Sequence, residues 1–464
     1  MENSNMDMFT KLSSSLLVLI ISYLPFKEAA RTSILSKQWF NLWKETTVLE
    51  FNESFFVDRD EDEDNQKAQR HVFIDFVKQI VMNYPRKAIQ KFSFVYSKPK
   101  ECLSDMQNFV LFAASRNVRN LGLDFSDPRW IEDDIERYPS KFELPLQVYQ
   151  LFGLESLLLF SCSFDVSRFT NFSALKTVFI GWIEITEVTV NILIRNCPQI
   201  ETLCLKKCWS LEHFEVSVQN SSLKNLILDK CHFMKNMIWV EGPRLQFFKY
   251  SGEINQFYLM NPMDMVEADL DFSMEPEFDE LGTILCDFLQ EFYAARVLTV
   301  CSVLLQIIPE GDDPLGLPAP INTRHLIVKT AMHENELVGI KFMLRSCRYI
   351  HTLTFDIVPG KIFPDYTPPF ELAPQELWTK KYRMNTCINH NLRVVNVKGF
   401  KGSDNEIYVL RFIIQFGANL EQVNLYISDE ETEDGENRDI YISKIRYIIT
   451  DDGALSKKLR IFIF

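Results

Sequence analysis

The nine residues LESLLLFSC, at positions 154–162, recur as IETLCLKKC at positions 200–208 and as LKNLILDKC at positions 223–231. In each copy, apolar side chains occupy the first, fourth and sixth positions, and a cysteine occupies the ninth. Alternation of this kind is typical of a short strand that buries one face. The spacing L-x-x-L-x-L-x-x-C therefore predicts one strand per copy, followed by a small side chain that turns inward: Cys162, Cys208 or Cys231.

Weaker copies extend the pattern in both directions. The second apolar site falls at positions 157, 178, 203, 226 and 248, at intervals of 21, 25, 23 and 22 residues, which is the leucine-rich repeat period. Each unit can bury its apolar face only against its neighbours, which favours a curved solenoid. Residues 262–295 are the hardest to place, although 280–292 has helical character, and loops are expected at 309–320 and 359–374. Further second sites are expected at Phe92, Leu121, Leu298, Leu326, Leu353, Val395 and Val423.

The N-terminal segment has a different, helical pattern. Residues 12–43 read LSSSLLVLIISYLPFKEAARTSILSKQWFNLW, with apolar side chains at 16, 17, 20, 21 and 24 on one wide helical face. Ser13 to Ser15 can cap this helix and Pro25 ends it. A second helix is expected at 27–35 and a third after Ser36. Three short helices cannot bury so many apolar groups among themselves, so another protein or the rest of the chain must cover some of them.

The stretch LPFKEAARTSILSKQW, at positions 24–39, is the most specific part of a resemblance to the F-box, which covers residues 7–50. The resemblance implies binding to the Skp adaptor and, through it, to the cullin of a ubiquitin ligase. The family usually has Leu-Pro where this chain has Leu12-Ser13, so we expect a looser entry turn and weaker adaptor binding. The residues expected to bind the adaptor are Leu12, Leu16, Leu17, Ile20, Leu24, Pro25, Leu35, Trp39 and Trp43.

The chain resembles plant F-box proteins that continue into leucine-rich repeats and an FBD segment. Residues 391–427 carry the FBD resemblance, as a strand, a Gly-rich turn, a helix and a strand. The predicted fold is α/β: a three-helix F-box at 7–50, an acidic linker at 51–70, a repeat solenoid with loop insertions at 71–390, and an FBD-like segment at 391–464. Within that last segment, 429–439 is expected to be an acidic loop and 440–449 a final helix or strand.

Charge and composition narrow the class of partner. The 464 residues carry a net charge of −14, and residues 1–50 contain five basic and five acidic side chains, so the excess lies downstream. An acidic body disfavours nucleic acid and anionic membrane as partners. No signal pattern or span long enough for a bilayer is evident, so we expect a cytoplasmic or nuclear protein whose ten cysteines are reduced.

The sequence contains no recognisable catalytic or metal-binding constellation. Nucleophile elbows, phosphate loops and HExxH motifs are missing, so we expect no enzymatic activity and no cofactor. Three cysteines and two histidines lie close in sequence, but they form no CxxC pair. The repeat itself accounts for the cysteines at 162, 208 and 231, so no metal site is predicted. The residues considered for zinc were Cys197, Cys204, Cys208, His213 and His232.

Side chains between the buried leucines should point out from the strands. Apolar groups at these positions suggest a target-binding stripe, although neighbouring repeats, a long loop or the C-terminal segment would explain them equally well. The stripe residues are Leu158, Phe160, Phe179 and Ile227, with Leu158, Phe179, Cys204 and Ile227 expected in one column across the strands.

The expected function is a substrate-recognition subunit of an SCF-type ubiquitin ligase, with the F-box holding the adaptor and the repeats holding an unknown target protein. One alternative is a repeat scaffold with no ligase role. Another is a ligand-dependent receptor, for which Lys206 and Lys207 form the only basic pair on the complete repeat strands.

Overall fold

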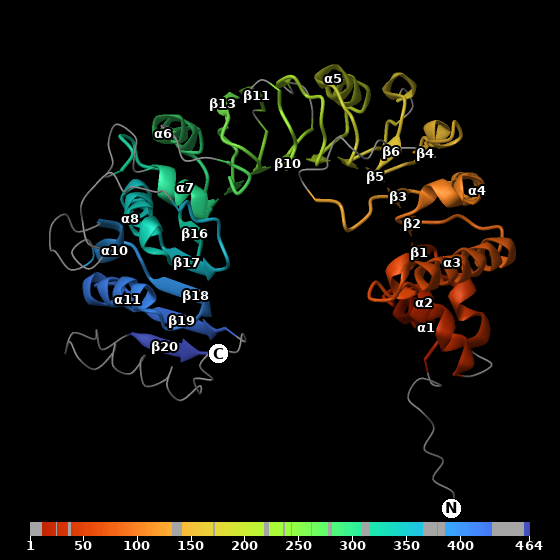
Figure 1. Cartoon of the computed structure of the whole chain (residues 1–464), viewed down its shortest axis with the longest axis horizontal. Helices are drawn as coiled ribbons and strands as arrows, with labels where there is room; N and C mark the ends of the chain where they lie inside the picture. The colour runs from red at the N-terminus through yellow and green to blue at the C-terminus, as the bar shows by residue number, and fades with distance from the viewer. Residues whose placement is uncertain are drawn as a thin grey trace, which may run out of the picture. The chain divides into compact units, whose positions relative to one another are not determined.

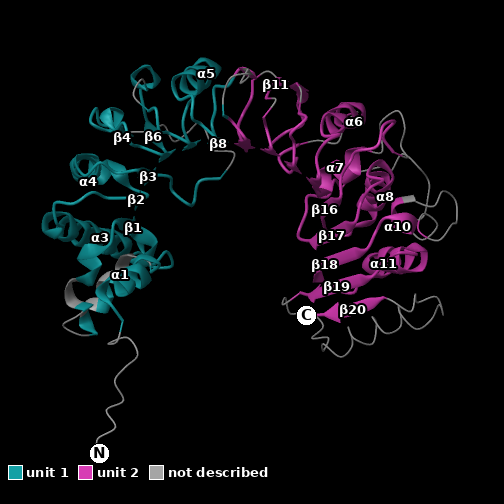
Figure 2. Ribbon diagram, turned by 180° about the vertical axis from the view of Figure 1, so that it is seen from behind, with its two compact units in different colours: residues 1–211, 220–222 teal, residues 212–219, 223–464 magenta. Residues whose placement is uncertain are grey.

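The computed structural model describes residues 12–24, 26–35, 39–131, 142–169, 172–217, 222–234, 237–242, 244–260, 262–276, 281–308, 316–364, 378, 386–428 and 459–464. The chain has a mixed α/β fold (Figure 1) and divides into two compact units (Figure 2). Unit 1 comprises residues 1–211 and 220–222, and unit 2 comprises 212–219 and 223–464.

Unit 1 begins with a small helical module and continues into a parallel sheet with the strand order β1-β2-β3-β5-β7-β8. Its helical elements are α1 (Ser14–Ser22), α2 (Phe26–Arg31), η2 (Thr32–Ile34), η3 (Trp39–Glu45), η4 (Glu53–Phe55), α3 (Glu63–Asn83), η5 (Pro99–Glu101), α4 (Leu103–Ser115), η7 (Val148–Gln150), η8 (Val166–Arg168) and α5 (Glu187–Asn196). Its main strands are β1 (Val48–Asn52), β2 (Lys91–Val95), β3 (Asn120–Asp124), β5 (Ser156–Phe160), β7 (Thr177–Gly181) and β8 (Thr202–Lys206), and β4 (Phe142–Glu143) pairs separately with β6 (Cys162–Ser163).

Unit 2 contains a series of parallel strands in the order β10-β12-β14-β15-β16-β17-β18-β19-β20. It also contains a small separate sheet with the order β13-β11-β9. Its strands are β9 (Phe214–Ser217), β10 (Asn225–Asp229), β11 (Met237–Glu241), β12 (Phe247–Ser251), β13 (Gln256–Met260), β14 (Glu267–Asp271), β15 (Val297–Val300), β16 (His325–Thr330), β17 (Thr352–Ile357), β18 (Val394–Phe400), β19 (Gln422–Ile427) and β20 (Arg460–Ile463). Its helices are α6 (Gly282–Glu291), α7 (Ser302–Ile307), η10 (Glu334–Glu336), α8 (Leu337–Ser346), α10 (Thr386–His390) and α11 (Asp404–Phe416). Helices α8, α10 and α11 lie on one side of strands β16 to β19 (Figure 1).

The second apolar sites of the repeats line up across the strands, as the spacing predicts. In unit 1 the register joins Leu49, Phe92, Leu121, Leu157, Val178 and Leu203. In unit 2 it joins Leu226, Phe248, Ala268, Leu298, Leu326, Leu353, Val395, Val423 and Ile461. Within the first column every side chain is at most 2% exposed. The strands predicted at these sites are therefore confirmed, together with helix α6 in the segment that was hard to place.

The predicted acidic linker at 51–70 is wrong as a description of these residues. Strand β1 and helix η4 occupy 48–55, and α3 already begins at Glu63. Asp62 caps α3, because its Oδ1 accepts a hydrogen bond from the Asn65 amide at 2.9 Å. Glu63 and Asp64 follow in the first turn, where carboxylates interact favourably with the positive end of the helix dipole. Much of the charge run therefore helps to start a helix.

The FBD-like segment has the predicted order of elements over 391–427: β18, a glycine turn, α11 and β19. Gly399 has φ of +69° and Gly402 has φ of +71°, in the left-handed region that favours glycine. A Cβ added at Gly399 would lie 2.5 Å from the Ile357 carbonyl oxygen. The expected acidic loop at 429–439 and the element at 440–449 lie outside the described residues, and β20 was not predicted.

The repeat cysteines lie where the motif predicts. Cys162, Cys208 and Cys231 are all buried, and their thiols donate to backbone carbonyls of the strands. The Cys208 Sγ lies 3.7 Å from the Ile180 carbonyl oxygen of the neighbouring strand. Each thiol thus fills space beneath the sheet and satisfies a weak hydrogen bond.

We expect Cys208→Ala to lower the free energy of unfolding by roughly 1–2 kcal/mol, because the truncation leaves a small cavity. Chemical denaturation measures this change, and Cys286→Ala, at a half-buried thiol of α6, is the matched control with a smaller expected effect.

We also expect purified protein to carry no stoichiometric zinc. About one zinc per chain in a metal analysis, lost in Cys208→Ala, would contradict the structural role.

Candidate functional site

The N-terminal module has its own small hydrophobic core. Leu17 and Ile21 of α1 pack with Ala29 of α2 and with Trp39 and Leu42 of η3. Leu12 and Val18 cover the edge of this cluster. Leu17 and Ile21 are fully buried, so the module uses one stripe of α1 to hold its helical segments together.

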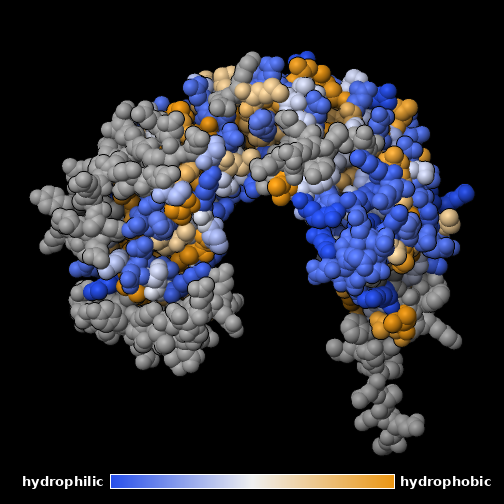
Figure 3. Space-filling view, in the orientation of Figure 1, coloured by the Kyte–Doolittle hydropathy of each residue, from blue (hydrophilic) through white to orange (hydrophobic). Residues whose placement is uncertain are grey.

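The other sides of α1, and Leu24 just beyond its end, expose apolar side chains. The exposed fractions are 47% for Leu16, 37% for Ile20 and 37% for Leu24. Figure 3 shows apolar atoms at the surface in the region labelled α1 in Figure 1. Solvated apolar surface of this kind is a candidate for a protein contact, because water is a poor environment for it. Others on the same module are Leu19, Tyr23, Ile34 and Leu35.

The structure divides the residues predicted to bind the adaptor. Leu16, Ile20, Leu24 and Leu35 are exposed, whereas Trp43 and Leu12 are partly buried. Leu17 and Trp39 are only 0% and 7% exposed, so they belong to the core of the module and not to its exposed surface. Pro25 lies outside the described residues.

Sequence reasoning missed three exposed members of this surface: Leu19, Tyr23 and Ile34. The segment SSLLVLIIS of α1 contains no charged residue, so hydrophobic periodicity could not separate its buried stripe from its exposed one. The one signal that points to them is the density of apolar residues itself, which exceeds what so small a core can bury.

Ser13, where the family usually has proline, caps α1. Its Oγ accepts from the Leu16 amide at 3.4 Å and lies 2.9 Å from the Ser15 Oγ. Its φ of −65° is the angle that a proline ring would impose. The entry turn therefore retains the proline-like backbone and gains a side-chain cap, which offsets the loosening expected from the sequence.

We expect Ser13→Ala to destabilise the start of α1 by about 1 kcal/mol, since it removes the cap but not the backbone geometry. Ser13→Pro should be tolerated, because the φ angle already fits proline. Hydrogen exchange of the α1 amides in the full chain measures both. Equal exchange rates in wild type and Ser13→Ala would show that the hydroxyl contributes nothing.

The candidate target face in unit 1 is built from outward positions on neighbouring strands. Leu158, Phe179 and Cys204 are consecutive partners in the register of β5, β7 and β8. Leu158 and Phe179 are half-buried, whereas Cys204 is only 6% exposed and contributes little accessible surface. Ile227 lies in unit 2, where its register partner is Lys249.

Phe160 lies one register row further along the same face. Its ring covers Gly181 so closely that a Cβ at Gly181 would lie 2.9 Å from the Phe160 Cδ1. The glycine therefore leaves room for the aromatic ring between strands. Phe160 is half-buried, like Leu158 and Phe179, so the three form an apolar area that the neighbouring strands only partly cover.

A tryptophan cluster at the ends of these strands was not predicted. Trp182 and Trp209 follow β7 and β8 and are 5% and 6% exposed. Trp130, from the loop after β3, packs edge-on against Trp182 with ring centroids 5.2 Å apart. The Lys207 Nζ lies 4.4 Å from the Trp182 centroid, a cation–π contact. The loop after β3 thus packs against the residues that follow β7 and β8.

The outward face of unit 2 is mainly polar. The Lys249 and Lys329 ammonium groups each lie 3.1 Å from a carboxylate oxygen of Asp269. Farther along, Asn424 donates to Asn396 at 2.8 Å and Asn396 donates to Thr354 at 3.1 Å. These side-chain hydrogen bonds link β19, β18 and β17 across the face, and sequence alternation gave no sign of them.

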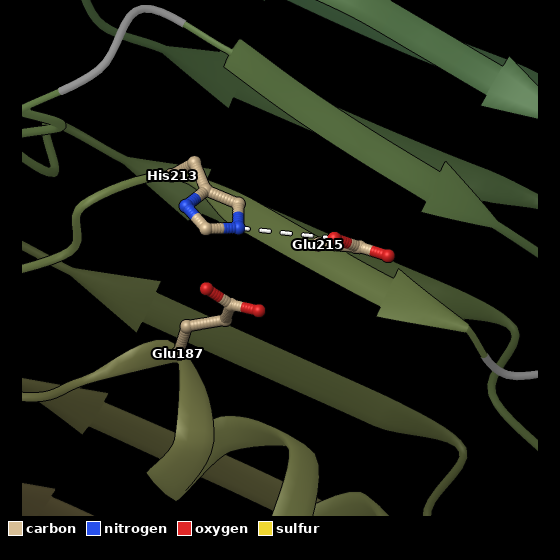
Figure 4. A group of neighbouring side chains, drawn as sticks. All are labelled: Glu187, His213 and Glu215. Carbon is tan, nitrogen blue, oxygen red and sulfur yellow. Dashed lines mark ion pairs between the residues drawn. The ribbon is translucent and has the colours of Figure 1, made fainter.

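The cysteines considered for zinc do not have the character of ligands. Cys197, Cys204 and Cys208 are buried, and burial raises the pKa of the Cys197 thiol to about 12. A thiol held protonated in this way is a poor metal ligand. His213 instead lies 3.7 Å from the Glu215 carboxylate within unit 2 (Figure 4). The figure also draws Glu187, which belongs to α5 of unit 1.

No helix in the described ranges is both long and apolar enough to cross a bilayer.

A helical module with exposed apolar side chains, followed by repeated parallel strands, is the arrangement expected of F-box proteins with leucine-rich repeats, and comparison with known families shows that class. A model of the F-box domain matches residues 9–50, and a model described as "FBD-associated F-box protein At5g56370, LRR repeats" matches residues 108–257. An F-box domain implies binding to a Skp-type adaptor.

Curated relatives from Arabidopsis thaliana extend the similarity over most of the chain. Putative F-box/LRR-repeat protein At1g56400 is 34% identical over 471 residues, which cover 97% of this chain and 94% of the relative. F-box protein At3g62230 is 33% identical over 427 residues, covering 91% and 92%. F-box/FBD/LRR-repeat protein At1g78750 is 25% identical over 366 residues, covering 75% and 76%. The chain belongs to the plant F-box/LRR-repeat family.

Proposed function

We propose that this chain is the substrate-recognition subunit of an SCF-type ubiquitin ligase. The observation that carries the proposal is the F-box domain with apolar side chains of α1 exposed around its own core. Those side chains would be covered by a Skp-type adaptor, which links the chain to a cullin. The same exposure would be costly in a self-contained cap.

In this proposal the parallel strand units stack as a curved solenoid, and the target protein binds their outward face. The apolar area at Leu158, Phe160 and Phe179 supplies the anchors, with Ile227 as a candidate in unit 2. Aromatic and aliphatic side chains of this kind tend to dominate interface energies. The target surface would be apolar with basic groups around it, to complement the acidic chain.

The chain would perform no chemistry of its own. Holding a target beside a ubiquitin-charged enzyme raises the effective concentration of the target's lysines at the thioester, and proximity alone then accelerates transfer. We also propose that the protein acts in the cytoplasm or nucleus, where it would meet an adaptor and a cullin.

Co-expression with a Skp-type adaptor, followed by purification through a tag on this chain, tests the proposal. We expect a stoichiometric complex, which should assemble with a cullin and promote ubiquitination of a co-purified protein. A folded chain that fails to bind the adaptor would favour the alternative of a repeat scaffold with no ligase role.

A further inference from the structure

The residue that follows the first apolar site of a repeat lies at one edge of the parallel strands, just before its strand begins. Two pairs of neighbouring strands carry opposite charges at this position. Arg119 and Glu155 precede β3 and β5 and form an ion pair at 3.2 Å. Arg393 and Glu421 precede β18 and β19 and form one at 2.9 Å. Side chains at this motif position therefore reach one another across adjacent strands.

Strands β15, β16 and β17 of unit 2 carry like charges at the same position. Arg296, Arg324 and His351 precede these three neighbouring strands. The Arg324 amide donates to the Arg296 carbonyl oxygen at 2.8 Å, and the His351 amide donates to the Arg324 carbonyl oxygen at 2.8 Å. Both arginines are exposed, and neither guanidinium has a hydrogen bond or ion pair with the rest of the chain. Adjacent like charges repel, so this arrangement destabilises the unbound protein.

The turns that lead into β15, β16, β17 and β18 contain no acidic residue. Together they hold four arginines and three histidines, although the whole chain has 63 acidic and only 49 basic side chains. Glu291 ends α6 just before the first of these turns, but it forms no ion pair with Arg296. This edge is therefore locally cationic in a chain of net charge −14. The four turn segments are 292–297, 320–325, 347–352 and 389–394.

Exposed tyrosines lie beside these cations. Tyr293 and Tyr349, in the turns before β15 and β17, are 40% and 49% exposed. Arg348, next to Tyr349, is also exposed, and its guanidinium is not engaged by the chain. Arginine and tyrosine are enriched at protein interfaces and among the residues that dominate binding energy. The edge thus has the composition of a contact surface as well as its charge.

We propose that this edge of unit 2 binds an acidic helix of a partner protein. A helix with one carboxylate per turn spaces these groups about 5.4 Å apart, close to the roughly 4.8 Å between strands, so each carboxylate would lie beside one cationic side chain. Arginine suits this role, since its planar guanidinium can bind a carboxylate through two hydrogen bonds. A nucleic acid fits less well, because the acidic body of the chain would repel a long polyanion. The basic edge is defined by Arg296, Arg324, Arg348 and His351.

The neighbouring strands limit the site on both sides. Val266, which is uncharged, occupies the same motif position before β14. Arg393, before β18, is already paired with Glu421. The site goes beyond the proposed ligase function, because it is separate from the F-box and from the apolar area proposed to hold the target in unit 1.

The probe is an alanine-based peptide of 14 residues with three glutamates on one helical face, at i, i+4 and i+7, and the same peptide with glutamines is the charge control. In fluorescence anisotropy with the full chain at low salt, we expect the glutamate peptide to bind at least about tenfold more tightly. A copy with two central prolines cannot form the helix and should bind at least about threefold more weakly. Equal binding of the proline copy would mean that the edge takes an extended acidic segment, against the proposal.

The double variant Arg296→Gln with Arg324→Gln should weaken binding of the glutamate peptide at least about tenfold, because it removes both free guanidinium groups. Arg119→Gln with Lys176→Gln is the matched control. These residues are exposed at the same motif position before β3 and β7 of unit 1, so the control removes equal charge from the chain. It should leave the affinity unchanged. Both double variants should keep the unfolding midpoint of the wild type, since all four side chains are exposed.

Several further results would overturn the proposal. Equal binding of the glutamate and glutamine peptides would remove the charge argument. Full retention by Arg296→Gln with Arg324→Gln would place the peptide elsewhere, and an equal loss in both double variants would assign the effect to the net charge of the chain. A tetranucleotide RNA, which carries the same charge as the peptide, would identify nucleic acid as the occupant if it binds more tightly. Deletion of 429–439 would identify this acidic segment of the chain itself as the occupant, if it tightens peptide binding at least tenfold only while both arginines are present.

Discussion

Leu24→Asp is expected to lower the affinity of the chain for a Skp-type adaptor by at least about 100-fold, and Ile20→Asp should do the same. Both side chains are 37% exposed on the F-box module, so an adaptor would bury them further. A carboxylate at either position would lose its hydration without gaining a partner, and a loss of about 3 kcal/mol corresponds to roughly 100-fold in affinity. Surface plasmon resonance with immobilised adaptor measures the change.

Val72→Asp is the matched control. Val72 is 61% exposed on α3 of the same unit, outside the F-box match, so an aspartate there should leave adaptor binding unchanged. Both F-box variants should keep the unfolding midpoint of the wild type. If Leu24→Asp and Ile20→Asp bind the adaptor as well as Val72→Asp does, the exposed side of α1 is not the contact surface.

A substitution at Leu17 should behave differently from one at Leu24, because Leu17 belongs to the small core and Leu24 to the exposed surface. Because Leu17 is fully buried, its replacement would lower adaptor binding by disturbing the small core, and the loss would come with a loss of stability. The sequence placed Leu17 and Leu24 in one group, since both fall on the wide apolar face of the helix expected there, although α1 itself ends at Ser22. Only the tertiary packing of Trp39 and Ala29 against one stripe distinguishes them.

The repeats could be predicted well because their signal is local. Each buried strand residue follows from alternation and spacing alone, and the register between strands follows from the constant motif. Ala268 shows the limit: it occupies the leucine site of β14 but is too small to mark a strand within EADLD. Strands β9, β11 and β13 were missed for a different reason. They lie in the part of each repeat that follows the main strand, and this part can be helix or strand. The sequence pattern predicted only the main strand.

Contacts outside the repeat motif could not be predicted from the sequence. Trp130 meets Trp182 through the loop after β3, and nothing in either local sequence joins them. The acidic run at 58–64 was misjudged because charge density alone suggests solvation. Its position before an amphipathic segment, which makes Asp62 a helix cap, was the more useful signal.

Leu158→Asp combined with Phe179→Asp is expected to release the target protein while the adaptor stays bound. The two residues are register partners on β5 and β7, so their side chains lie next to each other on the outward face. Both are half-buried, and a bound target would complete their burial. Two adjacent carboxylates in such an interface would lack partners and repel each other, which should reduce target recovery at least tenfold.

Quantitative mass spectrometry of proteins that co-purify with the chain measures this release, with the adaptor as the internal reference. Val188→Asp, at an exposed site on α5, is the control and should leave target recovery unchanged.

Ile227→Asp tests the unit 2 candidate separately. Its register partner Lys249 could pair with the new carboxylate, so the loss of target recovery should be smaller. Because the chain already buries Cys204, Cys204→Ser should alter target binding little, although it places a hydroxyl at a largely covered position of this face. If the double variant folds and retains both adaptor and target, the target binds elsewhere, and the half-buried apolar residues of β5 and β7 serve only the packing of neighbouring strands.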